Sequence, residues 1–206
     1  MLLPMTYRSL PLSLLVATLV AACAQSDTKP GEPAAEPVYL SESALPIGWP
    51  APGPYDRVSR KEYPAYRAAF TTSSSPNGGF WTLFRHIKRN NIPMTSPVEM
   101  TMKDQSGGEM QMERMGFLYQ SPAVGKTGAD GGTVDVRDVP ALSVLSFTWQ
   151  GPRGDAEIAK AKAAIEAALA ERKLTAASYR LFGYNSPSVP RRKQTYELQA
   201  ILKSKP

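Results

Sequence analysis

His86 is the only histidine of this 206-residue chain, and it stands just before an unusual stretch, NNIPMTSPVEM (Asn90–Met100). An imidazole transfers protons near neutral pH and is the commonest metal ligand among side chains. A single histidine gives no bis-histidine metal site, and no nucleophile–base pair is recognisable near it. His86 therefore has two interpretations: a partly exposed helix residue that hydrogen-bonds locally, or a single metal ligand at the rim of a cleft.

Methionines are the second chemical feature. They stand at even positions of a predicted hairpin, so that within each strand they share one face: Met94, Met100, Met102, Met110 and Met112. Filling of the core is the default for such a stripe, because the flexible thioether fits irregular gaps. The alternative is a soft, polarisable wall that adapts to a broad flat ligand.

Charge excludes some classes of function. The net charge is +6, with Lys and Arg scattered among the acids, which favours a solvated surface over nucleic-acid binding. Carboxylates such as Glu99, Glu113 and Glu197 are present, yet nothing places two of them together as an enzyme would need. We therefore predict a binding protein without a catalytic pair.

The N-terminus carries a targeting pattern. Arg8 precedes the apolar run Leu10–Ala22, which has the length of a signal peptide and ends in Val20-Ala21-Ala22-Cys23. Small residues before a cysteine resemble the bacterial lipobox, in which the thiol is acylated. Cys23 is the only cysteine, so an ordinary signal peptide or a buried thiol is the weaker alternative. We predict a lipoprotein signal peptide over residues 1–22 and a lipid anchor at Cys23, without deciding which envelope membrane holds it.

Residues 23–45 are rich in Pro, Ala, Glu and Gly, lack hydrophobic periodicity and are predicted to be a flexible tether. Residues 46–206 are long enough to bury one hydrophobic core. The predicted organisation is therefore one domain behind a tether.

Within the domain, apolar spacing predicts two helices. In the first, over 79–90, Phe80, Leu83, Phe84 and Ile87 fall on one face. The second covers 154–173, with Asp155 as its N-cap and the stripe Ile158, Ile165 and Leu169. Strands are predicted over 62–72, 92–102, 110–119, 133–149, 178–185 and 192–202.

The order of these elements is strand, helix, strand, strand, and it occurs twice. Tyr63-Pro64-Ala65-Tyr66 matches Val139-Pro140-Ala141-Leu142, and Thr95-Ser96-Pro97 matches Asn185-Ser186-Pro187. We predict a duplicated βαββ unit, with halves of about 62–119 and 133–202, and a kink at the Ser-Pro of each half that opens a cleft beside the helix. The fold class is α+β.

Two motifs within this frame resemble a known family. They are Met94-Thr95-Ser96-Pro97-Val98 after the first helix, and Gly183-Tyr184-Asn185-Ser186-Pro187 followed by Arg191-Arg192. The chain from Tyr63 to Leu202 is similar to the SOUL, or haem-binding-protein, family. The resemblance implies a distorted antiparallel barrel of two βαββ halves with two helices, related to effector-binding domains. His86 stands where family members usually carry an aromatic residue.

The resemblance also implies a ligand: haem or another tetrapyrrole, held non-covalently in an apolar cleft beside the first helix. The expected ligand-binding residues are Leu83, Phe84, His86, Ile87, Met94, Tyr184, Arg191 and Arg192. His86 is then a candidate axial ligand of iron. Arg191 and Arg192 either pair with propionates at the cleft mouth or form a solvated strand start.

The expected protein is therefore an exported monomer, lipid-anchored to the bacterial cell envelope, that binds a tetrapyrrole. The alternatives are a domain that binds another small apolar ligand or a partner protein, and a small-molecule hydrolase on the same fold.

Overall fold

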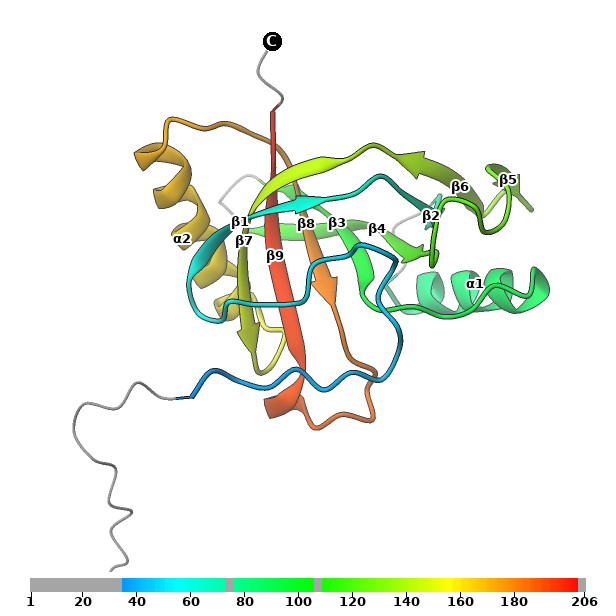
Figure 1. The fold of residues 1–206 in the computed structure, drawn as a ribbon, viewed down its shortest axis with the longest axis horizontal. Coiled ribbons are helices and arrows are strands. Elements are labelled where there is room, and N and C mark those ends of the chain that lie inside the picture. The colour runs from blue at the N-terminus through cyan, green and yellow to red at the C-terminus, as the bar shows by residue number, and fades with distance from the viewer. Residues whose placement is uncertain (1–34, 73–75, 106–108, 204–206) are drawn as a thin grey trace, which may run out of the picture. The chain divides into compact units, whose positions relative to one another are not determined.

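The structure is a computed structural model that describes residues 35–72, 76–105 and 109–203 (Figure 1). The predicted signal peptide, Cys23 and the first part of the tether lie outside these residues. Within them the chain forms nine strands, two α-helices and one short 3-10 helix. The elements are β1 (Val58–Tyr63), β2 (Tyr66–Thr71), α1 (Pro76–Arg89), β3 (Val98–Asp104), β4 (Met110–Leu118), β5 (Gly128–Asp130), β6 (Val134–Val139), β7 (Leu142–Gln150), α2 (Asp155–Glu171), β8 (Ala176–Gly183), the 3-10 helix η1 (Arg191–Lys193) and β9 (Thr195–Leu202).

All nine strands belong to one antiparallel sheet, in the order β1-β7-β9-β8-β3-β4-β2-β6-β5. The central pair joins the two predicted halves, because β3 pairs with β8 through partners such as Thr101 and Arg180. The α+β class is confirmed.

Two prolines interrupt strands that were predicted to be continuous. β1 ends and β2 begins on either side of Pro64-Ala65, and β6 and β7 flank Pro140-Ala141 in the same way. A proline gives no ladder donor, so a long strand breaks there. β1 and β7 lie at one end of the strand order, while β2 and β6 lie near the other. Because each two-residue link joins opposite ends, the sheet must curve strongly, as Figure 1 shows.

The duplication remains a prediction. The element order does repeat. Outward from the central β3–β8 pair, the sheet continues with β4 and then β2 on one side, and with β9 and then β7 on the other. The matched Ser-Pro pairs, however, are not equivalent: Ser96-Pro97 precedes β3, whereas Ser186-Pro187 follows β8. Both lie at the same end of an antiparallel pair, since Val98 faces Gly183. The expectation of a kinked strand in each half is therefore wrong.

Other predicted boundaries also change. The strand expected from Ile92 begins only at Val98, so Pro93 and Pro97 both lie before it. Asp155 is the first residue of α2 and not its cap, which is Gly154 without a side-chain hydrogen bond. The glycine-rich connector contains a short edge strand, β5, that was not predicted.

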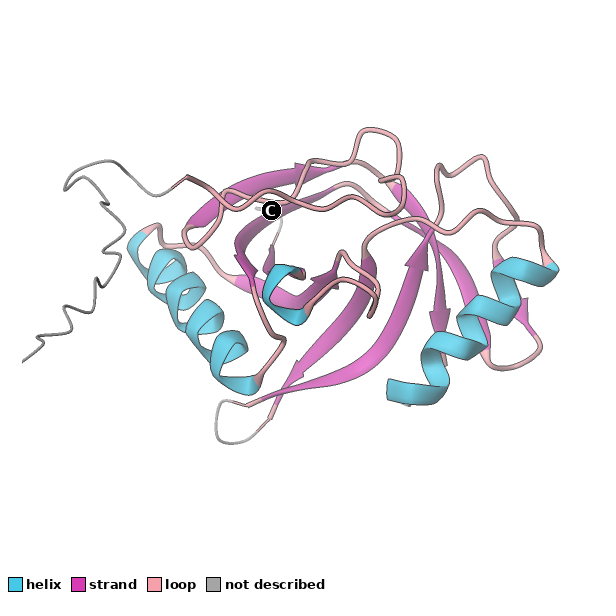
Figure 2. Ribbon diagram, turned by 90° about the horizontal axis from the view of Figure 1, so that it is seen from below, coloured by secondary structure: helices cyan, strands magenta, loops and turns pink. Residues whose placement is uncertain are grey.

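The two helices cover different parts of one sheet face, here called the helix face; Figure 2 shows them at opposite ends of the curved sheet. α1 packs its predicted stripe, Leu83 and Ile87, against buried residues of β2, β4 and β6 such as Ala69, Phe117 and Val136. α2 buries Ile158, Ile165 and Leu169 as predicted. None of the helices among the described residues is long and apolar enough to span a membrane.

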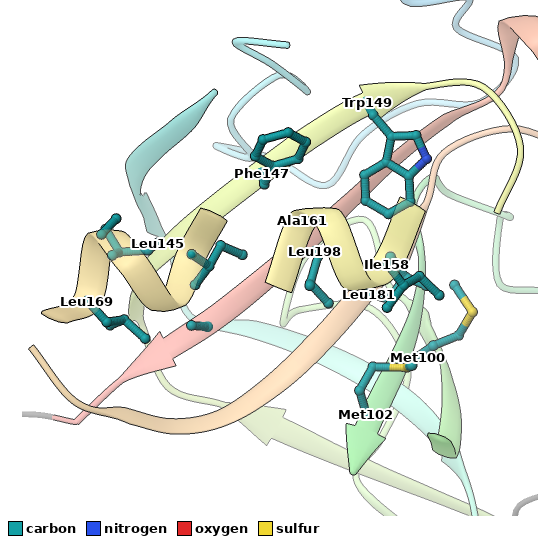
Figure 3. Close-up of a cluster of buried hydrophobic side chains, with 13 residues drawn as sticks. Met100, Met102, Leu145, Phe147, Trp149, Ile158, Ala161, Leu169, Leu181 and Leu198 are labelled. Carbon is teal, nitrogen blue, oxygen red and sulfur yellow. The ribbon is translucent and has the colours of Figure 1, made fainter. Parts of the chain in front are cut away.

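The buried hydrophobic residues between α2 and the sheet, here called the α2 cluster, include the methionines of β3 (Figure 3). Met100 and Met102 are buried against α2 and its neighbouring strands, and Met110 and Met112 pack on the same cluster. The core-filling interpretation is thus confirmed for Met100 and Met102.

The opposite face of the sheet holds a third cluster, built from aromatic residues and closed by the segment before β1. Successive residues of a strand point to opposite faces, so Leu181 joins the α2 cluster while Phe182 joins this one. Trp49 packs edge-on against the rings of Tyr63 and Tyr66 at 4.6 and 5.1 Å.

The described part of the predicted tether is hydrogen-bonded to the domain. The carbonyls of Leu40 and Ala44 accept hydrogen bonds from Asn185 and Ser96, at 2.6 and 3.0 Å. Glu42 accepts from the backbone N–H of Ser186 at 2.7 Å. Among the described residues, those from Glu36 onward form one compact unit, which contains all the helices and strands named above.

Candidate ligand-binding sites

A cavity of about 490 Å³ lies at the C-terminal end of α1 and is called the His86 pocket. Its walls are the last turns of α1, the loop 125–130 that leads through β5, and β6. The lining includes His86, Asn90, Ile92, Tyr119, Asp130 and Val136. This volume falls within the range of small-molecule sites, which is roughly 300–1,000 Å³.

His86 is held at both ring nitrogens. Nε2 lies 2.7 Å from the hydroxyl of Tyr119, and Nδ1 contacts the carboxylate of Asp130. The carboxylate of Asp130 can only accept, so Nδ1 carries a proton and donates to it. In the tautomer that has its proton on Nδ1 alone, Nε2 accepts from the hydroxyl of Tyr119, which keeps its own proton because burial raises the pKa of Tyr119 to about 12. The interpretation of His86 as a partly exposed residue with only local bonds is wrong, because its side chain is 4% exposed.

Asp130 is fixed by several donors besides His86. Arg89 Nη2 lies 2.5 Å from the same carboxylate oxygen, and Asn90 Nδ2 lies 3.3 Å from it. The hydrogen bonds from His86 and then from Arg89 hold the pKa of this carboxyl below its ordinary value. Asp130 is therefore an anionic anchor that sets the orientation of the imidazole.

This arrangement fits a histidine that ligates a metal. Such histidines usually donate their second ring N–H to a carboxylate, which fixes the ring and raises its basicity. Asp130 plays that part here, while Nε2 is hydrogen-bonded to the hydroxyl of Tyr119. Across residues 35–72, 76–105 and 109–203, no group of three or more His, Cys, Asp or Glu side chains is placed to hold a bare metal ion.

The other predicted binding residues are distributed over several parts of the domain. The side chains of Leu83 and Ile87 are fully buried between α1 and the sheet. Phe84 and Met94 are half-buried at the edge of that cluster, and Phe84 stacks on Phe80 at 6.1 Å. Of the predicted binding residues, only His86 lines the His86 pocket.

Tyr184, Arg191 and Arg192 lie elsewhere. Tyr184 is buried in the aromatic cluster of the opposite face, and both arginines are exposed on η1. Neither arginine lines the His86 pocket or the second pocket described below. The structure thus brings Leu83, His86 and Ile87 together on α1 and separates them from the C-terminal motif.

Tyr119 and Asp130, the partners of His86, were missed by the sequence analysis. They are 33 and 44 residues away from His86 along the chain. Asp130 stands in a stretch that reads as a glycine-rich connector, and Tyr119 ends a predicted strand. No local pattern brings these two residues to α1.

A second cavity, of about 380 Å³, opens on the face away from the helices and is called the Arg180 pocket. It lies among β2, β3, β8, β9 and the bend between β6 and β7. Its lining includes Tyr66, Phe70, Glu99, Arg137, Leu142 and Arg180. The two pockets share no lining residue: on β6, Val136 faces the first and Arg137 the second.

A buried polar network extends from this pocket under the aromatic cluster. Glu197, which has no exposed surface, accepts hydrogen bonds from Lys61 at 2.7 Å, Tyr63 at 2.9 Å and Gln199 at 2.6 Å. Gln199 in turn accepts from Nε of Arg180 at 2.7 Å. Burial raises the pKa of Tyr63 well above its ordinary value, so its hydroxyl acts as a donor.

The network ends at Glu99. Arg180 Nη1 donates to the hydroxyl of Tyr66 at 2.8 Å and to Glu99 at 3.4 Å, and Tyr66 donates to Glu99 at 2.7 Å. Two cations, Lys61 and Arg180, thus balance two carboxylates, Glu99 and Glu197. Such balance matters because a buried charge without a partner is costly.

Comparison with known proteins gives a family and a fold. The model of a family described as SOUL heme-binding protein matches residues 54–198. None of the curated proteins compared with the chain matches it. Among solved structures, EcmrR in its complex with DNA has a TM-score of 0.54 at 14% identity over 72% of this chain, and this chain spans only 58% of that one. The isolated C-terminal domain of EcmrR, of which 98% is covered, gives 0.51 at 13% identity over 72% of this chain. A structure described as a hydrolase from Listeria innocua gives 0.51 at 12% identity, over 73% of this chain and 94% of that one. At these identities the similarity to solved structures establishes the fold alone.

Proposed function

Because the chain belongs to the SOUL heme-binding protein family, we propose that it binds haem or a related tetrapyrrole non-covalently, in the His86 pocket. Family membership supports a small-molecule-binding protein, and the pocket beside α1 supports this location for the binding site. The single observation that carries the proposal is the geometry of His86: its Nδ1 is held by Asp130, and its Nε2 faces a cavity-lining hydroxyl that can rotate.

The residues around this pocket suit a flat ligand with acidic substituents. Ile92 and Val136 supply apolar wall, and Lys126 supplies an exposed cation at the rim. A Lys ammonium pairs with carboxylates such as propionates. Burying the apolar face of a porphyrin contributes several kcal/mol at about 25 cal/mol per Å², so micromolar binding does not require a strong iron ligand.

Haem, when bound, would supply a redox-active iron. This chain would position an imidazole for that iron: Asp130 accepts the hydrogen bond from Nδ1–H, and the hydroxyl of Tyr119 occupies Nε2 until a ligand replaces it. Nε2 of His86 would then hold the iron.

The proposal also includes the cellular location of the protein. The run Leu10–Ala22 and the following Cys23 support an exported protein that a lipid tethers to the bacterial cell envelope. Acylation stabilises membrane attachment by roughly 0.8 kcal/mol per buried methylene. A tethered domain of this kind would hold its ligand close to the membrane surface.

The test is a titration of residues 36–206 with haem, followed by absorbance in the Soret region. We expect saturable binding by the wild type, loss of the Soret shift in His86→Ala, and tighter binding in Tyr119→Phe, which frees Nε2. Met94→Ala and Arg191→Gln probe predicted binding residues that lie outside the pocket. They should bind haem as the wild type does.

Iron-free protoporphyrin, followed by quenching of tryptophan fluorescence, separates ligation from burial. If the pocket is correct, His86→Ala binds protoporphyrin with wild-type affinity while its haem affinity falls. An absence of saturable binding by the wild type, for haem and protoporphyrin alike, would reject the proposed function and leave the fold unaffected. Weaker haem binding in Arg191→Gln alone would move the site to the C-terminal motif.

A further inference from the structure

The side of α1 that faces away from the sheet carries a tryptophan with two cations next to it. α1 packs on one end of the curved sheet (Figure 2), so its other side is open to solvent. Trp81, Arg85 and Lys88 follow one another at intervals of four and three residues, which places them on one side of the helix. All three are exposed, and together they are called the Trp81 face.

The exposure of Trp81 is unusual for this residue type, which is mostly buried in folded proteins. Its surface is 59% accessible, whereas the other two tryptophans, Trp49 and Trp149, are 7% and 4% exposed. The half-buried ring of Phe84 lies edge-on to the indole at 5.8 Å, and the ammonium of Lys88 lies 5.5 Å from the centre of the same phenyl ring. The indole is therefore supported from below and presented to the outside.

The charge on the Trp81 face is positive. α1 contains no Asp or Glu, and neither Arg85 nor Lys88 forms an ion pair with a described residue. Arg89, at the end of the helix, is in contrast paired with Asp130 at 2.5 Å. The aliphatic stems of Arg and Lys can lie along an apolar surface while their charged ends reach into a polar layer. The face thus combines an apolar ring with two cations that are free to bind anions.

These features match the surface of an anionic lipid bilayer. A tryptophan prefers the interfacial layer of a membrane, where its ring meets apolar chains and its N–H meets polar groups. Each Lys or Arg near an anionic membrane surface strengthens binding by about fivefold. A protein partner fits less well, because three residues cover far less than the roughly 800 Å² that each side buries in a stable protein interface.

The predicted lipid anchor would make such a small contact sufficient. Cys23 lies about 13 residues before Glu36, where the compact unit begins, and a chain of that length reaches at most about 45 Å. This reach is comparable to the diameter of a domain of this size. A domain tethered so closely has a high local concentration at the membrane, and a few contacts then decide which side of it faces the lipid.

We propose that the Trp81 face docks on an anionic membrane surface, with the indole in the interfacial layer and Arg85 and Lys88 on lipid phosphates. Docking holds α1 against the membrane and brings the His86 pocket, at the C-terminal end of the same helix, close to the lipid. The proposal requires neither haem binding nor acylation, since the face belongs to residues 36–206. It can therefore fail its test without affecting the proposed function, and the reverse also holds.

The first test is co-sedimentation of residues 36–206 with vesicles of phosphatidylglycerol and phosphatidylcholine in equal parts, and with vesicles of phosphatidylcholine alone. Two cations at about fivefold each predict at least a tenfold preference for the anionic vesicles. The preference should weaken as the salt concentration is raised from about 0.1 M to about 1 M. Trp81→Ala should weaken binding to the anionic vesicles about tenfold, because the exposed indole no longer leaves water.

A pair of double variants separates this face from net charge. Arg85→Gln with Lys88→Gln should remove most of the preference for anionic vesicles. The matched control is Arg172→Gln with Lys173→Gln, which removes the same charge from two exposed residues at the end of α2 that form no ion pair with a described residue. The control should keep the preference of the wild type.

A second measurement identifies the side of the domain that meets the lipid. Residues 23–206 are coupled to a maleimide lipid through Cys23, the only cysteine, in the same anionic vesicles. Phospholipids that carry bromine near the headgroup should quench the fluorescence of the wild type, because Trp81 is exposed while the other two tryptophans are buried. Trp81→Phe should lose this quenching.

Several results would overturn the proposal. One is equal binding of the wild type to both kinds of vesicle, and another is an equal loss in the two double variants, which would leave net charge as the only cause. Unquenched fluorescence in the tethered wild type would place another side of the domain on the lipid. A dimer in solution that Trp81→Ala dissociates would assign the face to a second copy of the chain.

Discussion

Lys61→Met tests how far the buried network supports the fold. In the wild type the ammonium of Lys61 lies 2.7 Å from Glu197, and the two side chains are 8% and 0% exposed. The substitution keeps most of the apolar stem and removes the charge, which leaves the carboxylate of Glu197 buried without a cation beside it. Breaking a buried pair from one side in this way typically costs about 3–5 kcal/mol.

The remaining contacts place the expected loss at the lower end of that range. Glu197 still accepts hydrogen bonds from Tyr63, Gln199 and Thr148, at 2.9, 2.6 and 3.1 Å. We therefore expect Lys61→Met to lose about 3 kcal/mol of unfolding free energy. With a urea m-value of about 2 kcal/mol per M, the midpoint falls by roughly 1.5 M.

The assay is urea denaturation of residues 36–206, followed by tryptophan fluorescence and by circular dichroism. The matched control is Lys61→Met combined with Glu197→Gln, which removes both charges and keeps a hydrogen-bonding side chain at position 197. This double variant should recover a large part of the loss. A single variant that loses less than about 1 kcal/mol, or a double variant no better than the single, would refute the reasoning from an uncompensated charge.

Two further predictions concern the loop of the His86 pocket and the N-terminus. The pKa of Asp130 is depressed by the hydrogen bonds from His86 and Arg89, so its contribution to stability is present above its ordinary value of 3.8 and is lost as the pH falls through its folded-state pKa. We expect the amides of β5 and of the last turn of α1 to lose protection from hydrogen exchange below about pH 4, after correction for intrinsic rates, with no such step in Asp130→Asn; an identical pH profile for the two proteins would contradict this. For Cys23, mass spectrometry of the native protein should show a mature N-terminus at this cysteine carrying acyl chains, and a mature form that begins elsewhere with a free thiol would exclude the lipid anchor.

The sequence predicted the parts of the fold that depend on local periodicity. Both helices lie where the spacing of Leu83 with Ile87 and of Ile158 with Ile165 placed them, because an apolar stripe must face a core in any arrangement of the sheet. Strand boundaries were less accurate around Pro64, Pro97 and Pro140. A proline shows that a ladder is interrupted, but whether the strand bends there or begins there depends on its neighbours.

The candidate sites depended on pairings that no local pattern shows. His86 stood out because it is unique, but its burial follows from Tyr119 and Asp130, which the register of β6 with β5 and the end of β4 bring to α1. In the sequence, nothing places Glu99 and Glu197 together. They belong to one network only because β3, β8 and β9 pair so that Arg180 and Gln199 lie between them.

The bends at Pro64 and Pro140 have a consequence for how the chain is made. Through them β1 pairs with β7 and β2 with β6, so that Val58 is opposite Phe147 and Tyr66 is opposite Val139. Because the chain is synthesised from its N-terminus, residues 134–150 must be made before β1 has any strand partner and before β2 has its second strand partner. During that interval the first part of the chain exposes two strand edges that can pair with another copy. Contacts this distant in sequence also slow folding. Synthesis of this protein therefore includes a period of vulnerability to aggregation, which ends only when the second half arrives.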